Sequence, residues 1–140
     1  MTDGAPAPIA PELAADIARD PWTRAIGIEY LTIARGYCKA SLTLAPGMVN
    51  FQGRPHGGVI FTLADATFGA ACNSHGVPAV ALNVTISYIG GAEPGSRLVA
   101  EAREVRQGRR AGFYDVTVRD VDSDRVIAFA HCVAHRVSAD

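Results

Sequence analysis

The spacing of apolar and polar residues along the chain predicts one long buried helix set among strands. Residues 37–44 alternate apolar with polar side chains, which is typical of a strand with one buried face. Residues 57–73 are instead apolar at nearly every position, so a helix formed there has no solvent-exposed side. We expect this helix to end near residues 73–76, where Asn, Ser and Gly supply stop signals.

The other segments predict further strands and one short helix. A proline start, an early acid and apolar spacing favour a helix over residues 11–20, which Pro21 ends. Runs rich in β-branched residues, separated by Gly- or Asp-containing breaks, predict strands at residues 27–33, 80–89, 98–105, 113–119 and 126–137. Hairpin turns fit the last two breaks, so the expected order around the long helix is β-β-α-β-β-β-β.

This pattern indicates an α+β fold, in which an antiparallel sheet of about six strands wraps around one long central helix. The chain has 140 residues and no internal repeat, which predicts a single domain over residues 11–140. Residues 1–10 are rich in Pro and Ala and are expected to form a flexible N-terminal tail. Because one face of the sheet stays open, we expect a dimer or a larger homo-oligomer.

Composition narrows the class of function. The net charge of −1 gives no reason to expect nucleic acid or an anionic membrane as a partner. Three widely separated cysteines, with no Cys-x-x-Cys pair, argue against a disulfide framework and against a zinc ribbon. Residues 1–8 have no positive region followed by a long apolar run, so we expect no secretory signal there, and no stretch approaches the roughly 20 apolar residues that span a bilayer. We therefore expect a cytoplasmic protein that needs no metal and no other cofactor.

Asp65 is the first candidate for chemistry. It is the only acidic residue between Arg54 and Glu93, and it lies within the long apolar helix. A carboxylate in such a helix loses hydration, which is unfavourable unless a partner or a wet pocket compensates. Its presence there indicates a functional role. The alternative is a structural Asp that bonds a neighbouring amide in the core or at a subunit contact.

The start of the long helix is the second candidate. His56, Gly57 and Gly58 place small residues where the first helical N–H groups lack internal partners. These N–H groups lie at the positive end of the helix dipole and can stabilise a developing oxyanion. The alternative is a Gly-rich cap that serves tight packing only. Gly57 and Asp65 are eight residues apart, or about 12 Å along a helix, so one chain cannot bring both to one carbonyl.

It follows that a working site would be shared between two subunits whose helices lie side by side and antiparallel. Gly57 would come from one chain and Asp65 from the other.

The pattern Asn50-(x5)-His56-Gly57-Gly58-(x6)-Asp65, followed by residues 71–74 (Ala-Cys-Asn-Ser), resembles the hotdog-fold acyl-CoA thioesterases of the phenylacetic acid degradation type. The resemblance extends over residues 20–137. It implies a hotdog fold, with a sheet wrapped on a central helix. It also implies dimers with shared sites and a homotetramer built as a dimer of dimers.

The resemblance also implies a role for each residue of the motif. Asp65 would be the catalytic carboxylate, acting as nucleophile or as general base on water. The Gly57 N–H would polarise the thioester carbonyl, helped by Gly58. Asn50 would help to place the carbonyl or the attacking water, and His56 would support the loop and the helix start.

Further contacts to the substrate are expected from two regions. An aryl or medium-chain acyl group is plausible because four aromatic residues are candidates to line an apolar pocket: Phe51, Phe61, Phe68 and Tyr88. The chain departs from the family after Tyr88, where Ile-Gly-Gly-Ala-Glu-Pro replaces a Phe-Leu-x-Pro-like segment. In the family the turn near Arg109 and Arg110 lies by the nucleotide end of coenzyme A, so these two are candidates to contact its phosphates; a solvated turn is the alternative.

The function that the sequence predicts is hydrolysis of an acyl-CoA thioester to the free acid and coenzyme A. An enoyl-CoA hydratase or dehydratase on the same fold is one alternative, but its pattern has Asp five residues before the histidine, where this chain has Phe51. The other alternative is a non-catalytic protein that binds or senses acyl-CoA.

Overall fold

The computed structural model describes residues 4–137, which form a six-stranded antiparallel sheet and three helices. In the sheet the strands lie in the order β1-β2-β4-β5-β6-β3. Their bounds are Glu29–Ala34 (β1), Tyr37–Thr43 (β2), Ala79–Tyr88 (β3), Arg97–Gln107 (β4), Ala111–Asp120 (β5) and Val126–Arg136 (β6). The predicted strands and their order along the chain are confirmed, with ends that differ by one or two residues.

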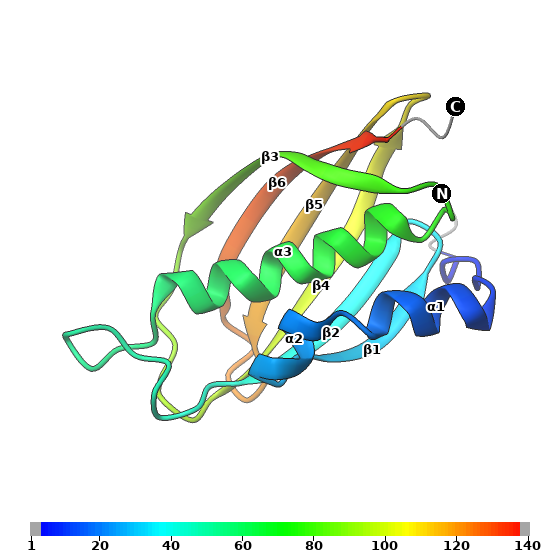
Figure 1. Cartoon of the computed structure of the whole chain (residues 1–140). Coiled ribbons are helices and arrows are strands. Elements are labelled where there is room, and N and C mark those ends of the chain that lie inside the picture. The colour runs from blue at the N-terminus through cyan, green and yellow to red at the C-terminus, as the bar shows by residue number, and fades with distance from the viewer. Residues whose placement is uncertain (1–3, 138–140) are drawn as a thin grey trace.

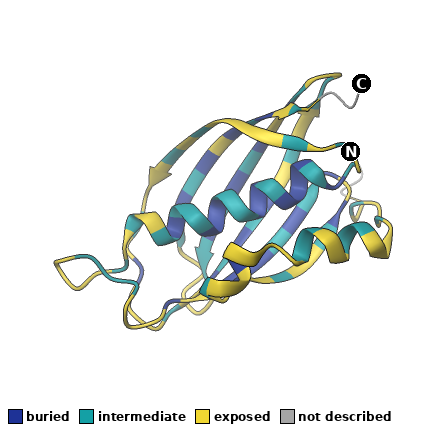
Figure 2. Cartoon of the chain, in the orientation of Figure 1, coloured by how far each residue is buried: buried dark blue, intermediate teal, exposed yellow. Residues whose placement is uncertain are grey.

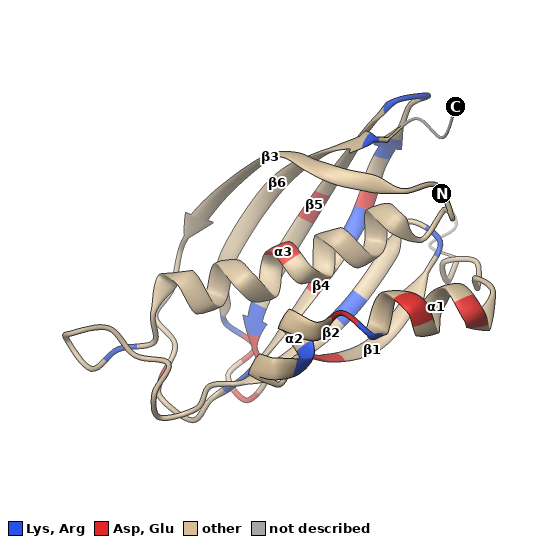
Figure 3. Cartoon of the chain, viewed as in Figure 1, with Lys and Arg blue, Asp and Glu red and all other residues tan. Residues whose placement is uncertain are grey.

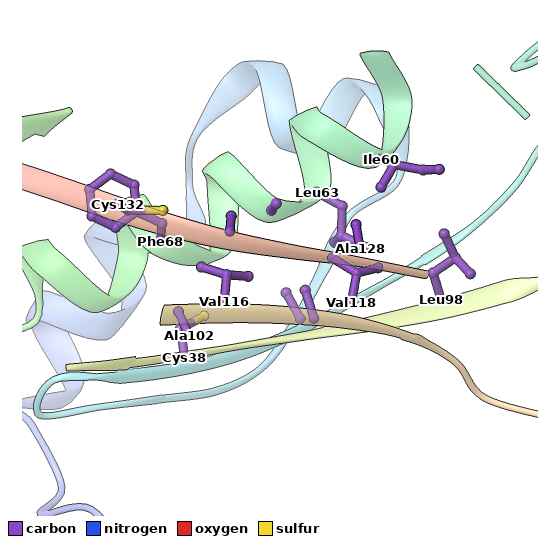
Figure 4. Close-up of a cluster of buried hydrophobic side chains, with 14 of the residues drawn as sticks. Cys38, Ile60, Leu63, Phe68, Leu98, Ala102, Val116, Val118, Ala128 and Cys132 are labelled. Atoms are coloured by element: carbon purple, nitrogen blue, oxygen red, sulfur yellow. The ribbon is translucent and has the colours of Figure 1, made fainter. Parts of the chain in front are cut away.

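The long helix α3, Gly57–Asn73, crosses one face of the sheet, which curves around it (Figure 1). The expected architecture, an antiparallel sheet wrapped around one central helix, is therefore confirmed. Side chains of α3 and alternate residues of the strands form the core between them (Figure 4). Phe68 of α3 packs against Tyr114 of β5, with ring centroids 5.6 Å apart, and both side chains are buried.

Two short helices precede the sheet, where the sequence predicted one. Helix α1 spans Pro11–Ala18 and helix α2 spans Pro21–Ile26. Pro21 ends no helix but begins one, because a proline suits the first helical position, where its missing N–H has no partner to lose. Asp20 accepts a hydrogen bond from Trp22 N and caps α2. Gly27 ends it with φ of 91°, so the predicted strand from residue 27 begins two residues later.

Side-chain hydrogen bonds hold the end of α3 to the sheet. Asn73 donates through Nδ2 to the Ala79 carbonyl at 3.1 Å and accepts from Ala79 N at 3.0 Å. Ser74 Oγ donates to the Ala71 carbonyl and accepts from Gly36 N at 2.7 Å. Asn73 thus ties the end of α3 to the start of β3, and Ser74 ties it to the residue before β2, so these bonds fix where α3 stops relative to both strands.

Strand β3 lies at one edge of the sheet and is exposed along much of its length (Figure 2). It pairs with β6 on one side only. Val80 is 51% exposed and Leu82 is 68% exposed. A long edge strand with exposed apolar side chains offers its free backbone groups to another strand.

The N-terminal segment reaches the opposite edge. The Arg35 amide donates to the Ala7 carbonyl at 2.8 Å, and Pro8 forms a bridge with Ala34 at the end of β1. The first three residues of the predicted flexible tail lie outside the described residues. Within residues 4–137, no helix combines the length and apolar character needed to cross a membrane.

Candidate active site

Asp65 is half-buried, and as the one acidic residue of α3 it gives that helix its red band in Figure 3. The residues one turn before and after it, Thr62 and Gly69, are also partly exposed. The side chains of Leu63, Ala64, Thr67 and Phe68 point into the core. The sequence pattern suggested a helix buried on all sides, but α3 keeps a half-buried stripe, and Asp65 lies on it.

Asp65 borders a cavity of ≈ 400 Å³ between α3 and the N-terminal helices. Leu13 and Ile17 of α1 and Tyr30 of β1 form its apolar wall. Val77 and Pro78, after the end of α3, close one end. None of these residues was predicted to be part of a site. The apolar spacing of α1 showed that the helix packs on something, but not on what.

Burial raises the pKa of the Asp65 carboxyl above its ordinary value, and the negative charge of Asp20 raises it further. Asp20 lines the same cavity. A raised pKa makes the carboxylate a stronger base once it is ionised, which suits a nucleophile or a general base.

This electrostatic coupling can be tested through the pH dependence of activity. Asp65 must be ionised to act, so kcat/KM should fall as the pH drops through its raised pKa. Asp20→Asn removes the neighbouring charge and should move this acid limb to lower pH; Asn also preserves the cap of α2. Asp16→Asn is the matched control, because Asp16 lines the same cavity but does not contribute to the shift of Asp65. An acid limb that stays in place in Asp20→Asn would contradict the coupling.

His56 caps the start of α3. Its Nδ1 accepts a hydrogen bond from Gly58 N at 2.9 Å, so this ring nitrogen carries no proton in that geometry. The arrangement agrees with the supporting role predicted for His56. It also occupies the Gly58 amide, which was predicted to assist at the carbonyl.

The Gly57 N–H is left without a hydrogen-bond acceptor among the described residues. Tyr88 packs its ring beside Gly57 and donates its hydroxyl to the Gly57 carbonyl at 3.1 Å. The end of β3 therefore holds the first peptide of the helix in place. The geometry leaves Gly57, and not Gly58, as the free donor at the helix start.

Asn50 organises the loop before α3. Its Oδ1 accepts hydrogen bonds from Gln52 N at 2.9 Å and from Arg54 N at 3.2 Å. The Nδ2 donors make no hydrogen bond to any described residue and remain available to a substrate oxygen. A role in placing a carbonyl would therefore use Nδ2.

The aromatic residues expected around an acyl group are dispersed. Phe68 belongs to the core against the sheet, and Phe51 stands at a loop tip with 97% of its surface exposed. Neither these two nor Phe61 and Tyr88 line the cavity at Asp65. The apolar wall there comes from α1 and β1, because the N-terminal segment folds back over α3.

Arg109 and Arg110 lie in the turn between β4 and β5, beside the end of β6. This is the end of the sheet where α3 stops and β3 begins, opposite to Gly57. Within one chain the two arginines are therefore far from the Gly57 amide.

A six-stranded antiparallel sheet curved around one long central helix is the hotdog arrangement. The chain belongs to the thioesterase superfamily, whose family model matches residues 52–127. The family membership and the hotdog fold predicted from the motif are thus confirmed.

Two relatives show how far the similarity extends. A putative esterase of Archaeoglobus fulgidus is 38% identical over 110 residues, which cover 79% of this chain and 71% of that protein. The acyl-coenzyme A thioesterase PaaI of Escherichia coli is 32% identical over 118 residues, or 84% of each chain.

Solved structures agree with these relatives. The structure of E. coli PaaI superposes with a TM-score of 0.85 at 30% identity, covering 91% of this chain and 95% of that one. A Streptococcus mutans protein bound to acetyl-CoA superposes with a TM-score of 0.76 at 28% identity, covering 80% and 90%.

Proposed function

We propose that this protein hydrolyses acyl-coenzyme A thioesters to the free acid and coenzyme A, with Asp65 at the centre of the reaction. The observation that carries this proposal is the position of Asp65. It lies half-buried beside a cavity on the central helix, with a raised pKa, while the free Gly57 N–H lies at the start of that helix. The similarity to PaaI, named as an acyl-CoA thioesterase, and to a protein solved with acetyl-CoA supports coenzyme A as the leaving group.

The chemistry needs two groups. The Asp65 carboxylate attacks the thioester carbonyl carbon, or takes a proton from a water that attacks it. The carbonyl oxygen gains negative charge, which the Gly57 N–H and the helix dipole stabilise. The C–S bond then breaks, and coenzyme A leaves as a thiolate that takes up a proton. If Asp65 is the nucleophile, water must hydrolyse the resulting anhydride in a second step.

Both groups lie on one continuous helix, about 12 Å apart, so they act together only across a subunit boundary. The free edge of β3 offers a way to build such a boundary. Antiparallel pairing of β3 with the β3 of a second copy continues the sheet and covers Val80 and Leu82. A two-fold axis there sets the two α3 helices side by side and antiparallel.

We further propose that two such dimers associate into a tetramer. Phe113 of β5 and Val133 of β6 are direct partners on the face of the sheet away from α3, and Phe113 is 43% exposed. Sedimentation measurements that give a monomer at micromolar concentration would count against both the dimer and the tetramer.

The proposed dimer would bring Arg109 and Arg110 of one chain to the same end as the Gly57 of its partner, where we expect the nucleotide of coenzyme A to reach them. Arg109→Ala with Arg110→Ala should raise KM for an acyl-CoA about tenfold or more, since hydrogen bonds to charged groups contribute roughly 1.5–3 kcal/mol. KM for the matching acyl-pantetheine, which lacks the nucleotide, should change little. Arg24→Ala, in α2, is the control. Equal effects on both substrates would argue for a solvated turn.

Thiol release from acetyl-, hexanoyl-, benzoyl- and phenylacetyl-CoA tests the proposed function directly. We expect turnover of an aryl or medium-chain substrate by the wild-type protein. Tight binding of acyl-CoA without thiol release would favour the non-catalytic binding protein. Loss of an enoyl-CoA absorbance without thiol release would favour the hydratase.

A further inference from the structure

The cavity beside Asp65 has a definite construction. Its floor is the half-buried face of α3, where Ala66, Gly69 and Ala70 carry little or no side chain. Its roof is α1, which contributes Leu13 and Ile17. The volume of ≈ 400 Å³ lies in the range of small-molecule sites, and a cavity of about 150 Å³ already accepts a benzene ring.

Gly69 lies in the floor of the cavity and has open surroundings. A Cβ built on Gly69 meets no atom within 4 Å. Glycine in a helix interior is unfavourable by about 1 kcal/mol relative to Ala, and packing within one chain gives no reason for its presence here. Gly69 follows Asp65 by one helical turn, on the same face. An atom held at Asp65 therefore has free space directly along the helix toward Gly69.

The charge of the lining has one sign. The titratable groups that border the cavity, apart from Tyr30, are the carboxyls of Asp16, Asp20 and Asp65, and no Lys, Arg or His among the described residues lines it. Arg19 pairs with Asp16 outside the lining. An acyl group that ends in a second carboxylate would meet like charges here, whereas an uncharged chain or ring would meet Leu13, Ile17 and Tyr30.

We propose that this cavity is the acyl subsite. It takes an uncharged aryl or medium-chain acyl group, Gly69 sets its depth, and its carboxylates exclude acyl groups that carry a second carboxylate. The proposal rests on the function proposed above, because it places the thioester carbon at Asp65 and the rest of the acyl group under α1.

Gly69→Leu fills the cavity from its floor and tests the assignment. We expect kcat/KM for hexanoyl-CoA and phenylacetyl-CoA to fall at least tenfold while acetyl-CoA changes less than about threefold, the range of effects that a few methylenes produce in an apolar pocket. Gly69→Ala, which adds a single carbon, should have a small effect on all three. Equal losses on all substrates, or none, would overturn the assignment.

A second variant enlarges the cavity instead of filling it, and the substituted residue lies in α1, away from the β3 edge. Ile17→Ala removes part of the roof and should raise the ratio of kcat/KM for decanoyl-CoA to that for hexanoyl-CoA. Leu31→Ala is the matched control, since Leu31 is an apolar residue of β1 that does not line this cavity. An unchanged ratio in Ile17→Ala would contradict a roof made by α1.

The charge of the lining gives an independent test. The wild type should hydrolyse glutaryl-CoA at least tenfold less efficiently than hexanoyl-CoA. Asp16→Asn with Asp20→Asn should narrow that difference, because both substitutions remove like charge from the rim. Equal hydrolysis of the two substrates by the wild type would overturn the exclusion of anionic acyl groups.

Binding separates failure of the subsite from failure of the proposed function. S-hexyl-CoA, a thioether that cannot be hydrolysed, should bind the wild type at least tenfold more tightly than coenzyme A in calorimetry. Gly69→Leu should abolish that difference. If the difference is present but no acyl-CoA releases thiol, the subsite stands and the proposed hydrolysis fails. If thiol is released but both ligands bind equally, the subsite is wrong.

Discussion

Asp65→Asn is expected to lower kcat/KM for the best acyl-CoA by a factor of about 10² or more. Asn is nearly the same size as Asp, so the cavity beside α3 keeps its shape. What the substitution removes is the negative charge that attacks the carbonyl or takes the proton from water. The effect should appear in kcat as well as in kcat/KM, because this group acts in the transition state and not in ground-state binding.

The same substitution should stabilise the protein at neutral pH. The pKa of Asp65 is raised in the folded state by burial first and by Asp20 second. The folded state therefore holds this proton more tightly than the unfolded chain does. The contribution of Asp65 to stability is fully present below the unfolded pKa and is lost as the pH rises through the folded pKa. Asp65→Asn should thus have a higher Tm than the wild type at pH 7, and this gain should shrink toward acid pH.

Thermal unfolding at both pH values, together with thiol release, checks these two effects on one variant. If Asp65 is a catalytic group whose burial lowers the stability of the protein, Asp65→Asn should lower the activity and raise Tm. A variant that loses stability together with activity would instead identify Asp65 as the structural residue considered above. Full activity in Asp65→Asn would remove Asp65 from the mechanism.

Gly57→Pro should lower kcat by a factor of about 10²–10³, the effect of removing one oxyanion donor. Proline deletes the Gly57 N–H and leaves the helix intact, because Gly57 is the first residue of α3 and proline is favoured there. His56 has φ of −69° and ψ of 133°, the extended conformation that a following proline requires. Gly57→Ala is the matched control. It keeps the N–H, and its Cβ would lie 3.5 Å from the Tyr88 ring, an ordinary contact.

Mixing inactive variants tests whether the site is shared. In a dimer of one Gly57→Pro chain and one Asp65→Ala chain, one of the two sites combines the intact Asp65 with the intact Gly57. Random mixing makes half of the dimers mixed, so activity should recover to about a quarter of the wild-type value. Unfolding and refolding the two variants together ensures exchange of subunits. If heterodimers are shown to form but remain inactive, the Asp65 and the Gly57 of one site do not come from different chains.

The motif residues of the central helix were predictable because the signals around them are local. The continuous apolar run from Gly57 to Asn73, bounded by two glycines and by Asn, Ser and Gly, determined where α3 begins and ends. Asp65 was recognisable as a candidate functional residue because burying a lone carboxylate in such a run is unfavourable, and a functional role explains its presence. The separation of Gly57 and Asp65 along one helix followed from helical rise alone.

The surroundings of Asp65 were not predictable in the same way. The predicted helix over residues 11–20 ends at Ala18, and Pro21, which was expected to end it, begins α2 with Asp20 as its cap. The sequence does not show which of Phe61 and Phe68 belongs to the core. The orientation of α3 on the sheet places Phe68 in the core against Tyr114. Side-chain type alone does not say which face of a helix meets the sheet.

The sequence by itself determined the α+β class, the order of the strands along the chain and the family. It also determined the pair of groups proposed at the centre of the candidate site, Gly57 and Asp65. These depend on periodicity and on residues close together along the chain. Only the tertiary structure decided that the Tyr88 hydroxyl binds the Gly57 carbonyl, that α1 covers Asp65, and that Gly69 leaves space beside it. These features depend on contacts between segments distant in sequence, and such contacts exist only after the core has set the helices in place on the sheet.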